Sequence, residues 1–289
     1  IGGIDYTKQV IENNLAGISV DKYVRVTSDA FKKLIDSMGG VKVYVSKDMK
    51  YTDKTQGLYI DLKQGQQTLN GSQAEQFVRY RNDNLGDIGR IQRQQILLKA
   101  LQKKLQSPRT LWQIPKIWKV LQNEMDTDLT QEEILNLASF SLGLDKQNIR
   151  MLMLPGRASN PREYNLSYWL IAPDQKKTVI QEYLDSNSIS SRISKSAFRS
   201  RIVIYNSTND GKLGSKVKLL LAQNGYRNVY LRQGNLPPLA KTQIIVQKGD
   251  TNSAQQVLNS LNFGELEYSS TGDLNSDITI VLGKDAKIK

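Results

Sequence analysis

Apolar residues recur along the first two thirds of the chain with the spacing of amphipathic helices. Phe31, Leu34 and Met38 show this period, and Gly39-Gly40 provides the glycine that commonly ends a helix. Alternating segments between them are typical of strands. We expect helices over about 5–15, 29–38, 71–78, 87–106, 111–122, 130–142 and 174–184, and strands over about 23–26, 41–45, 58–62 and 149–154.

A serine-rich stretch separates this part from a second unit. Residues 185–200 hold seven Ser in sixteen positions and few large apolar side chains, which is typical of a linker. The remaining segments follow the order β-α-β-β-α-β with one further strand, which predicts a small α+β domain. We place the domains at 1–187 and 201–289, with the linker at 188–200.

Composition excludes several kinds of chemistry. The 289 residues contain no His and no Cys, so there is no thiol nucleophile, no disulfide and no Ser-His-Asp triad. The available groups are carboxylates, Arg, Lys, Tyr or an oxygen-bound metal ion such as Mg²⁺. No apolar run approaches the ~18–20 residues of a membrane-spanning helix. The net charge of +12 favours anionic partners.

Basic residues concentrate in segment 78–104, where seven Lys or Arg stand against two Asp. If residues 79–81 are extended, Arg79 and Arg81 share one face. In the helix that follows, Arg90 lies one turn before Gln94, on a stripe continued by Leu97, Leu98, Leu101 and Leu105. Arginines at a helix N-terminus with apolar walls behind them suit a phosphate or pyrophosphate joined to an apolar group.

A purely structural interpretation of these residues also stands. Arg90 can pair with Asp87, Asp87 can cap the helix, and Arg79 and Arg81 can be solvated surface residues. Spacing alone does not separate the two interpretations.

Three stretches carry a resemblance to a known family. Residues 31–45 resemble a helix-Gly-Gly-strand segment, and residues 57–71 a stretch with the pattern G-L-x-I-x-L-x-x-G…L-x-G. Val78–Arg81 followed by Asp87–Gln95 carries the most specific motif. Residues 1–187 resemble the LytR-CpsA-Psr family of cell-envelope phosphotransferases, and residues 201–283 resemble its companion C-terminal domain.

This resemblance implies a three-layer α/β/α catalytic domain with a mixed central sheet. It implies binding of a polyprenyl-pyrophosphate-linked glycan and transfer of the phosphoglycan to a peptidoglycan hydroxyl, with release of polyprenyl phosphate. By motif position, Arg79, Arg81, Arg90 and Gln94 bind the pyrophosphate, and Mg²⁺ helps to neutralise it. Asp87 orients Arg90 or acts near the acceptor hydroxyl, so Asp87 and Arg90 are the expected catalytic residues.

The family's domain normally begins with a cytoplasmic tail, a membrane helix and strands that carry an active-site Asp and Arg. We expect such a segment before Ile1, with the membrane anchor and the metal ligands in it. The chain alone is then an incomplete enzyme of the extracytoplasmic face of the bacterial cell membrane.

Three predicted helices supply candidate walls for the prenyl chain, although the same residues suit an ordinary core. The candidate lipid-binding residues are Leu97, Leu101, Ile114, Ile117, Trp118, Leu121, Ile134, Leu137 and Phe140.

Two other functions compete with phosphotransfer. One is a non-catalytic envelope module that holds polyprenyl phosphate or glycan without turnover. The other is a nucleic-acid-binding regulator, suggested by the net charge and thirteen Tyr. The basic residues form no recognised DNA-reading helix and no aromatic platform for bases, so we do not expect a nucleic-acid partner.

Overall fold

The computed structural model describes most of the chain, in nine stretches. These are residues 2–15, 18–82, 86–107, 117, 124–144, 149–160, 162–165, 168–183 and 197–288. Within them, no helix combines the length and the apolar character needed to cross a bilayer. The predicted helix at 111–122 lies outside the described residues except for position 117.

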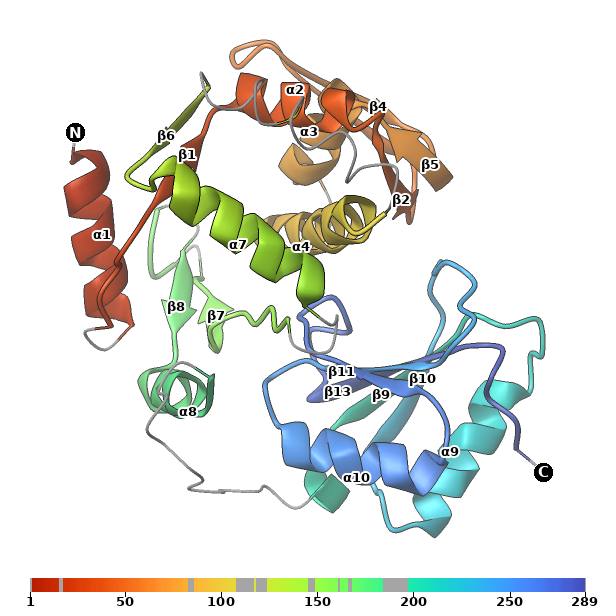
Figure 1. The fold of residues 1–289 in the computed structure, drawn as a ribbon. Coiled ribbons are helices and arrows are strands. Elements are labelled where there is room, and N and C mark those ends of the chain that lie inside the picture. The colour runs from red at the N-terminus through yellow and green to blue at the C-terminus, as the bar shows by residue number, and fades with distance from the viewer. Residues whose placement is uncertain are drawn as a thin grey trace.

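The N-terminal part mixes helices with short strands (Figure 1). Its helices are α1 (Gly3–Asn14), α2 (Ser28–Ser37), α3 (Gly71–Arg79), α4 (Gly86–Leu105), α7 (Gln131–Gly143) and α8 (Pro173–Tyr183). Its strands are β1 (Val24–Val26), β2 (Val41–Val45), β3 (Met49–Asp53), β4 (Leu58–Leu62), β5 (Gly65–Leu69), β6 (Met125–Thr127), β7 (Gly156–Ala158) and β8 (Trp169–Ile171).

These strands pair two by two. The antiparallel pairs are β1 with β6, β2 with β5, β3 with β4, and β7 with β8. The predicted α/β class is confirmed, but the described residues of this part show no larger sheet that joins the pairs into a central layer. The mixed sheet that the structure does contain, of five strands, belongs to the C-terminal domain.

Helix α3 packs against α2, α4 and β4 and organises the core of the N-terminal part. Its start is fixed by a capping box, in which the Asn70 and Gln73 side chains each bond the other's backbone N–H. At Gly71, a Cβ atom would lie 2.2 Å from the carbonyl oxygen of Lys32, so this close approach to α2 requires glycine. The core that results contains Phe77, which is 1% exposed.

The C-terminal domain has the predicted element order. Its elements are a 3₁₀ turn (Ala197–Arg199), β9 (Ile202–Asn206), α9 (Leu213–Gln223), β10 (Val229–Arg232), β11 (Gln243–Val246), α10 (Thr251–Leu261), β12 (Glu265–Glu267) and β13 (Ile278–Leu282). The sheet order is β10-β9-β13-β11-β12, with β11 antiparallel to β13 and the other pairs parallel. Figure 1 shows α9 and α10 together on the face that points away from α4. Ala197, within the predicted linker, is part of this domain's core.

Two local expectations were wrong. The segment around Arg79 is helical up to that residue, and the turn comes at Tyr80, whose φ and ψ are −59° and 128°. The segment 149–154 forms no strand. Helix α3 extends to Arg79, past the buried Phe77, and the N–H groups of residues 151 and 153 donate hydrogen bonds to the C-terminal domain.

The expected stripe along α4 is also corrected. Leu97 and Leu101 are buried, whereas Leu98 and Leu105 are 55% and 37% exposed. The buried apolar face of α4 is therefore narrower than the sequence pattern indicates.

Candidate functional site

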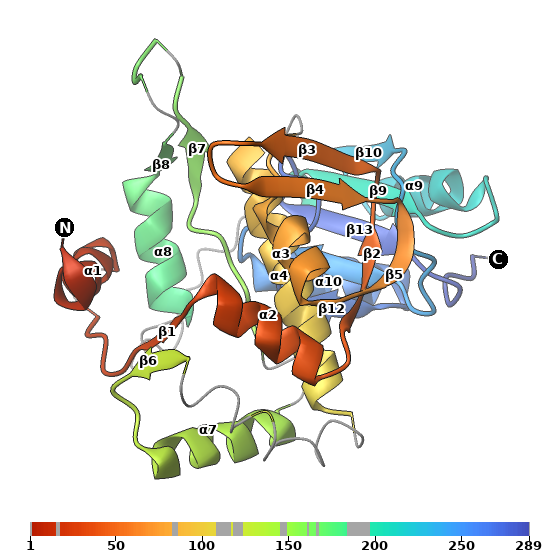
Figure 2. The same cartoon turned by 90° about the horizontal axis from the view of Figure 1, so that it is seen from above.

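A cavity of about 780 Å³ lies where the end of α3, the start of α4 and the β3–β4 hairpin meet. In Figure 2 this hairpin crosses beside α3 and α4. The lining residues are Tyr51, Asp53, Gln56, Leu58, Val78, Arg79, Arg81, Asn82, Gly86, Arg90 and Gln94. We call this cavity the arginine pocket. It brings together all four residues predicted to bind pyrophosphate, although their phosphate-binding role stays a prediction.

Arg79 is held in position from two sides. Its Nη1 donates to Glu75 Oε1 at 3.3 Å, one helical turn earlier in α3, and its Nη2 donates to Gln56 Oε1 at 3.1 Å. Gln56 belongs to the turn between β3 and β4. The guanidinium therefore bridges the helix and the hairpin, which reduces the conformational freedom that anion binding would otherwise have to restrict.

Residues 80–82, which follow α3, are held by side-chain contacts. The buried Arg93 donates a hydrogen bond from Nη2 to the carbonyl of Tyr80, and its guanidinium lies 5.1 Å from the Tyr80 ring centroid. The hydroxyl of Tyr80 donates in turn to the carbonyl of Asn82 at 2.7 Å. In the sequence, Arg93 is one of seven basic residues in segment 78–104, and its charge alone predicts no role for it. Its place in the predicted helix, one turn from Ile96 and Leu97, is the feature of the sequence that could have indicated a buried arginine.

Helix α4 begins at the pocket wall. Gly86, its first residue, has φ of 49°, a conformation that glycine adopts without strain. The free N–H groups of the first turn give this end of a helix a partial positive charge, which favours anions. Arg90 and Gln94 follow one turn apart on the pocket side. Asp87 lies in the first turn of α4, and its side chain is outside the described part of the structure.

Asp53 is a pocket carboxylate that sequence analysis missed. Its Oδ1 accepts hydrogen bonds from the backbone N–H groups of Thr55 and Gln56, at 3.0 and 3.2 Å, and so shapes the hairpin turn. Nothing in the short polar segment around it distinguishes Asp53 in the sequence. Within the described ranges, no three acidic side chains come close enough together to hold a metal ion.

The predicted lipid-binding residues fall into three groups. Leu97, Leu101 and Ile117 are buried in the core of the N-terminal part, and Ile134 is half-buried. Leu137 and Phe140 are 50% and 65% exposed. Outside the described residues are Ile114, Trp118 and Leu121. Their lipid-binding role stays a prediction.

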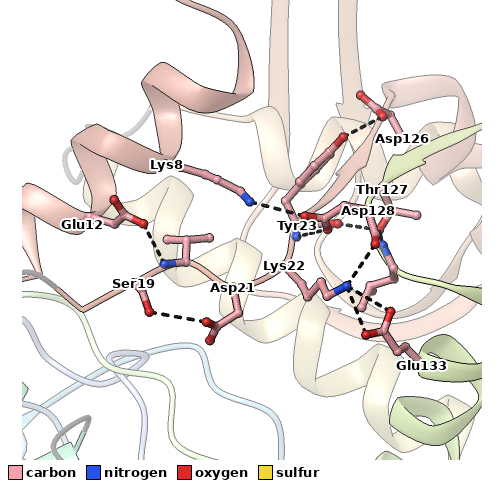
Figure 3. Close-up of polar contacts among 12 residues, drawn as sticks. Lys8, Glu12, Ser19, Asp21, Lys22, Tyr23, Asp126, Thr127, Asp128 and Glu133 are labelled. Carbon is pink, nitrogen blue, oxygen red and sulfur yellow. Dashed lines mark hydrogen bonds and ion pairs between the residues drawn. The ribbon is translucent and has the colours of Figure 1, made fainter.

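A second, largely apolar groove of about 650 Å³ lies between β1 and α7, and we call it the α7 groove. Its lining residues are Lys22, Tyr23, Val24, Leu129, Glu133, Asn136, Leu137 and Phe140. Polar contacts hold its walls together (Figure 3). The ammonium of Lys22 pairs with Glu133 at 3.1 Å, and the N–H of Tyr23 donates to Asp128 at 2.8 Å.

The carboxylates around this groove are stabilised in their charged form. The backbone N–H of Tyr23 and the ammonium of Lys8 lower the pKa of Asp128. The N–H of Thr130 and the ammonium of Lys22 lower the pKa of Glu133. The lining of the groove therefore combines the charged pair of Lys22 and Glu133 with apolar side chains.

Sequence comparison defines the class of protein. The LytR_cpsA_psr family profile matches residues 1–184, and a profile described as "LytR cell envelope-related transcriptional attenuator" matches residues 199–285. The chain belongs to the LytR-CpsA-Psr family.

Two curated proteins are similar to this chain in sequence. Regulatory protein MsrR of Staphylococcus aureus is 28% identical over 194 residues, which is 65% of this chain and 57% of MsrR. The polyisoprenyl-teichoic acid–peptidoglycan teichoic acid transferase TagV of Bacillus subtilis is 32% identical over 191 residues, which is 64% of this chain and 48% of TagV. The chain thus spans about half the length of these relatives.

Two solved structures are similar in fold to this chain. The crystal structure of B. subtilis TagV is 30% identical with a TM-score of 0.52, over 62% of this chain and 68% of that one. A Streptococcus agalactiae protein has a TM-score of 0.54 at 22% identity, over 62% of this chain and 61% of its own, and supports the fold alone.

Proposed function

We propose that this protein transfers a phosphoglycan from a polyprenyl-pyrophosphate carrier to a hydroxyl group of peptidoglycan. The observation that carries the proposal is the convergence of Arg79, Arg81, Arg90 and Gln94 on one pocket at the start of α4. The planar guanidinium group binds phosphate oxygens in pairs, so three of them in one cavity suit a diphosphate better than a single carboxylate. The name of TagV as a teichoic acid transferase supports this class of reaction.

The proposed step is one phosphoryl substitution. The acceptor hydroxyl oxygen bonds to the phosphorus next to the glycan, and the bond from that phosphorus to the bridging oxygen breaks. Polyprenyl phosphate leaves with the electron pair, and the hydroxyl proton passes to a base, a role that we assign to Asp87. Arg79, Arg81 and Gln94 would hold the diphosphate, while Arg90 would stabilise the charge that develops on the leaving phosphate.

Mg²⁺ is part of the proposal as the cation that reduces the diphosphate charge. Mg²⁺ is usually held by one or two carboxylates together with phosphate oxygens and water. Asp53 is the carboxylate on the described wall of the pocket, and one of its oxygens already bonds two backbone N–H groups. The described residues do not by themselves form a metal centre, and the step above assigns roles only to Arg79, Arg81, Asp87, Arg90 and Gln94.

The lipid and the cellular site complete the proposal. The α7 groove, with Leu137 and Phe140 on its wall, would take part of an apolar prenyl chain. A reaction between a lipid-linked donor and peptidoglycan places the protein at the extracytoplasmic face of the cell membrane.

The test is incubation of the purified protein with a polyprenyl-pyrophosphate-linked glycan, a peptidoglycan acceptor and Mg²⁺. We expect a glycan–peptidoglycan phosphodiester and free polyprenyl phosphate, both detected by mass spectrometry. The double variant R79A/R81A should lose the product, whereas R157A should retain it, since Arg157 lies on β7 and pairs with Glu163. Retained lipid without product in the wild type would favour the non-catalytic alternative. Equal turnover in the double variant would refute the assignment of the arginines.

A further inference from the structure

Helix α4 holds one loop of the C-terminal domain through its side-chain amides. The loop is taken as residues 267–272, from the last residue of β12 into the connection to β13. The N–H of Ser270 donates to Gln95 Oε1 at 2.9 Å, and the carbonyl of Ser270 accepts from Gln92 Nε2 at 2.8 Å. Gln92 Nε2 also donates to the carbonyl of Gly272 at 2.9 Å. Gln95 and Ser270 are buried, so the hydrogen bond between them is shielded from water.

Contacts on both sides of these amides extend the attachment. Lys99, one turn after Gln95, forms an ion pair with Glu267. Burial lowers the pKa of Lys99, while the pairing with Glu267 opposes that shift. From the other side, the N–H of Met151 donates to the carbonyl of Tyr268 at 3.1 Å. The loop is therefore held between α4 and the segment that follows α7.

The two functions of α4 use opposite faces. Gln92, Gln95 and Lys99 follow the i, i+3, i+7 spacing of one helix face, which contacts the loop. Arg90 and Gln94 line the arginine pocket from the opposite face, because each helical residue turns by about 100°. The same helix thus joins the pocket to the C-terminal domain.

We propose that the C-terminal domain is a positioning element of the arginine pocket, acting through Gln92 and Gln95. An α-helix moves as a nearly rigid rod, so the face that is held fixes the position of Arg90 and Gln94 on the other face. Paired hydrogen bonds to phosphate depend on geometry, and an error of about 1 Å weakens them strongly. This inference rests on the proposed function for its ligand, pyrophosphate.

Two Gln-to-Glu substitutions with different expected results test the proposal. Q95E keeps an acceptor for the N–H of Ser270 and places a carboxylate one turn before Lys99, a favourable order on a helix. Q92E replaces a donor with an acceptor that faces the carbonyls of Ser270 and Gly272. Both changes add one negative charge at nearly constant size, but they differ in hydrogen-bond direction and in surroundings, since position 95 is more buried and lies one turn before Lys99. Q255E, on the exposed side of α10, is the charge-matched control.

Two measurements on the whole chain are combined. Hydrogen exchange of residues 267–272 reports the attachment, and calorimetric titration with inorganic pyrophosphate reports the pocket. We expect Q92E to exchange faster and to bind pyrophosphate about fivefold or more weakly, in the range of typical coupling between sites. Q255E should match the wild type in both measurements, and Q95E should keep the slow exchange of residues 267–272. In an R90A background the effect of Q92E on affinity should shrink, which a general loss of stability would not cause.

Several results would overturn the proposal. Faster exchange in Q92E with unchanged affinity would show an attachment that does not position the pocket. Unchanged exchange in Q92E would show that these amides do not hold the loop. A wild-type protein that does not bind pyrophosphate would refute the ligand of the proposed function, and this inference with it. Normal wild-type binding that Q92E leaves intact would refute the positioning role alone.

Discussion

The most direct prediction concerns Arg79, whose surroundings allow binding and stability to be separated. In R79A the arginine pocket loses a guanidinium that is placed by Glu75 and Gln56 at 3.3 and 3.1 Å. A hydrogen bond to a charged group contributes about 1.5–3 kcal/mol. At 1.4 kcal/mol for each tenfold change, pyrophosphate binding should weaken by about 10- to 150-fold.

The cost in folding should be much smaller. The side chain of Arg79 is 37% exposed, and exposed ion pairs such as that with Glu75 contribute about 0–1 kcal/mol. R79A should therefore remain folded under conditions where its binding defect is large. R79K keeps the charge but loses the planar fork, so we expect it to bind with intermediate affinity.

Calorimetric titration with inorganic pyrophosphate at constant ionic strength provides the assay, with R157A as the matched control. The Arg157 side chain is 60% exposed and is paired with Glu163, and its removal changes the net charge by the same amount. A loss of affinity shared equally by R79A and R157A would mean that only the overall charge matters. Wild-type affinity in R79A would refute the pocket assignment outright.

Three further predictions concern the core, one surface pair and the α7 groove. F77A should lower the free energy of unfolding by about 3–5 kcal/mol in chemical denaturation, since Phe77 is 1% exposed. The guanidinium of Arg157 holds the pKa of Glu163 at about 2. The contribution of the ionised Glu163 to folding stability is therefore complete above pH 4.5 and is lost as the pH falls toward 2. In R157A, an NMR titration should find that pKa closer to 4.5. F140S should leave the unfolding free energy within about 0.5 kcal/mol, because Phe140 is 65% exposed, but should weaken binding of a prenyl pyrophosphate.

For each of these three predictions, one result would contradict the reasoning. A loss below about 1 kcal/mol in F77A would mean that the site collapses around the missing ring or is not part of the core. An unchanged Glu163 titration in R157A would assign the low pKa to the backbone N–H of Asn160, the second contributor. If F140S weakened prenyl and inorganic pyrophosphate equally, the α7 groove would not hold the lipid.

The sequence by itself determined the local elements that have strong internal signals. A helix over about 130–142 was predicted, and α7 begins there with a capping box between Thr130 and Glu133. The element order of the C-terminal domain was also predicted, because short, mostly apolar strands alternate along the chain with helical segments. Strands β3 and β5 were missed, since their polar residues gain stability only from the hydrogen bonds to β4 and β2.

For the candidate site, the sequence identified the residue types, and the tertiary structure placed them in one cavity. Arg79 and Arg81 were expected on one strand face, yet the pocket forms because α3 ends and the chain turns between them. Asp53 reaches the same pocket from a hairpin that the pattern did not predict.

Helix α4 shows the physical limit of the pattern most clearly. Periodicity indicates one buried face, but this helix has two, because the C-terminal domain covers the face of Gln92 and Gln95. A glutamine that bonds a distant backbone cannot be distinguished by sequence from one that faces water. Local spacing therefore determined that α4 is a helix and which residues share its faces, while only the folded chain decided what each face contacts.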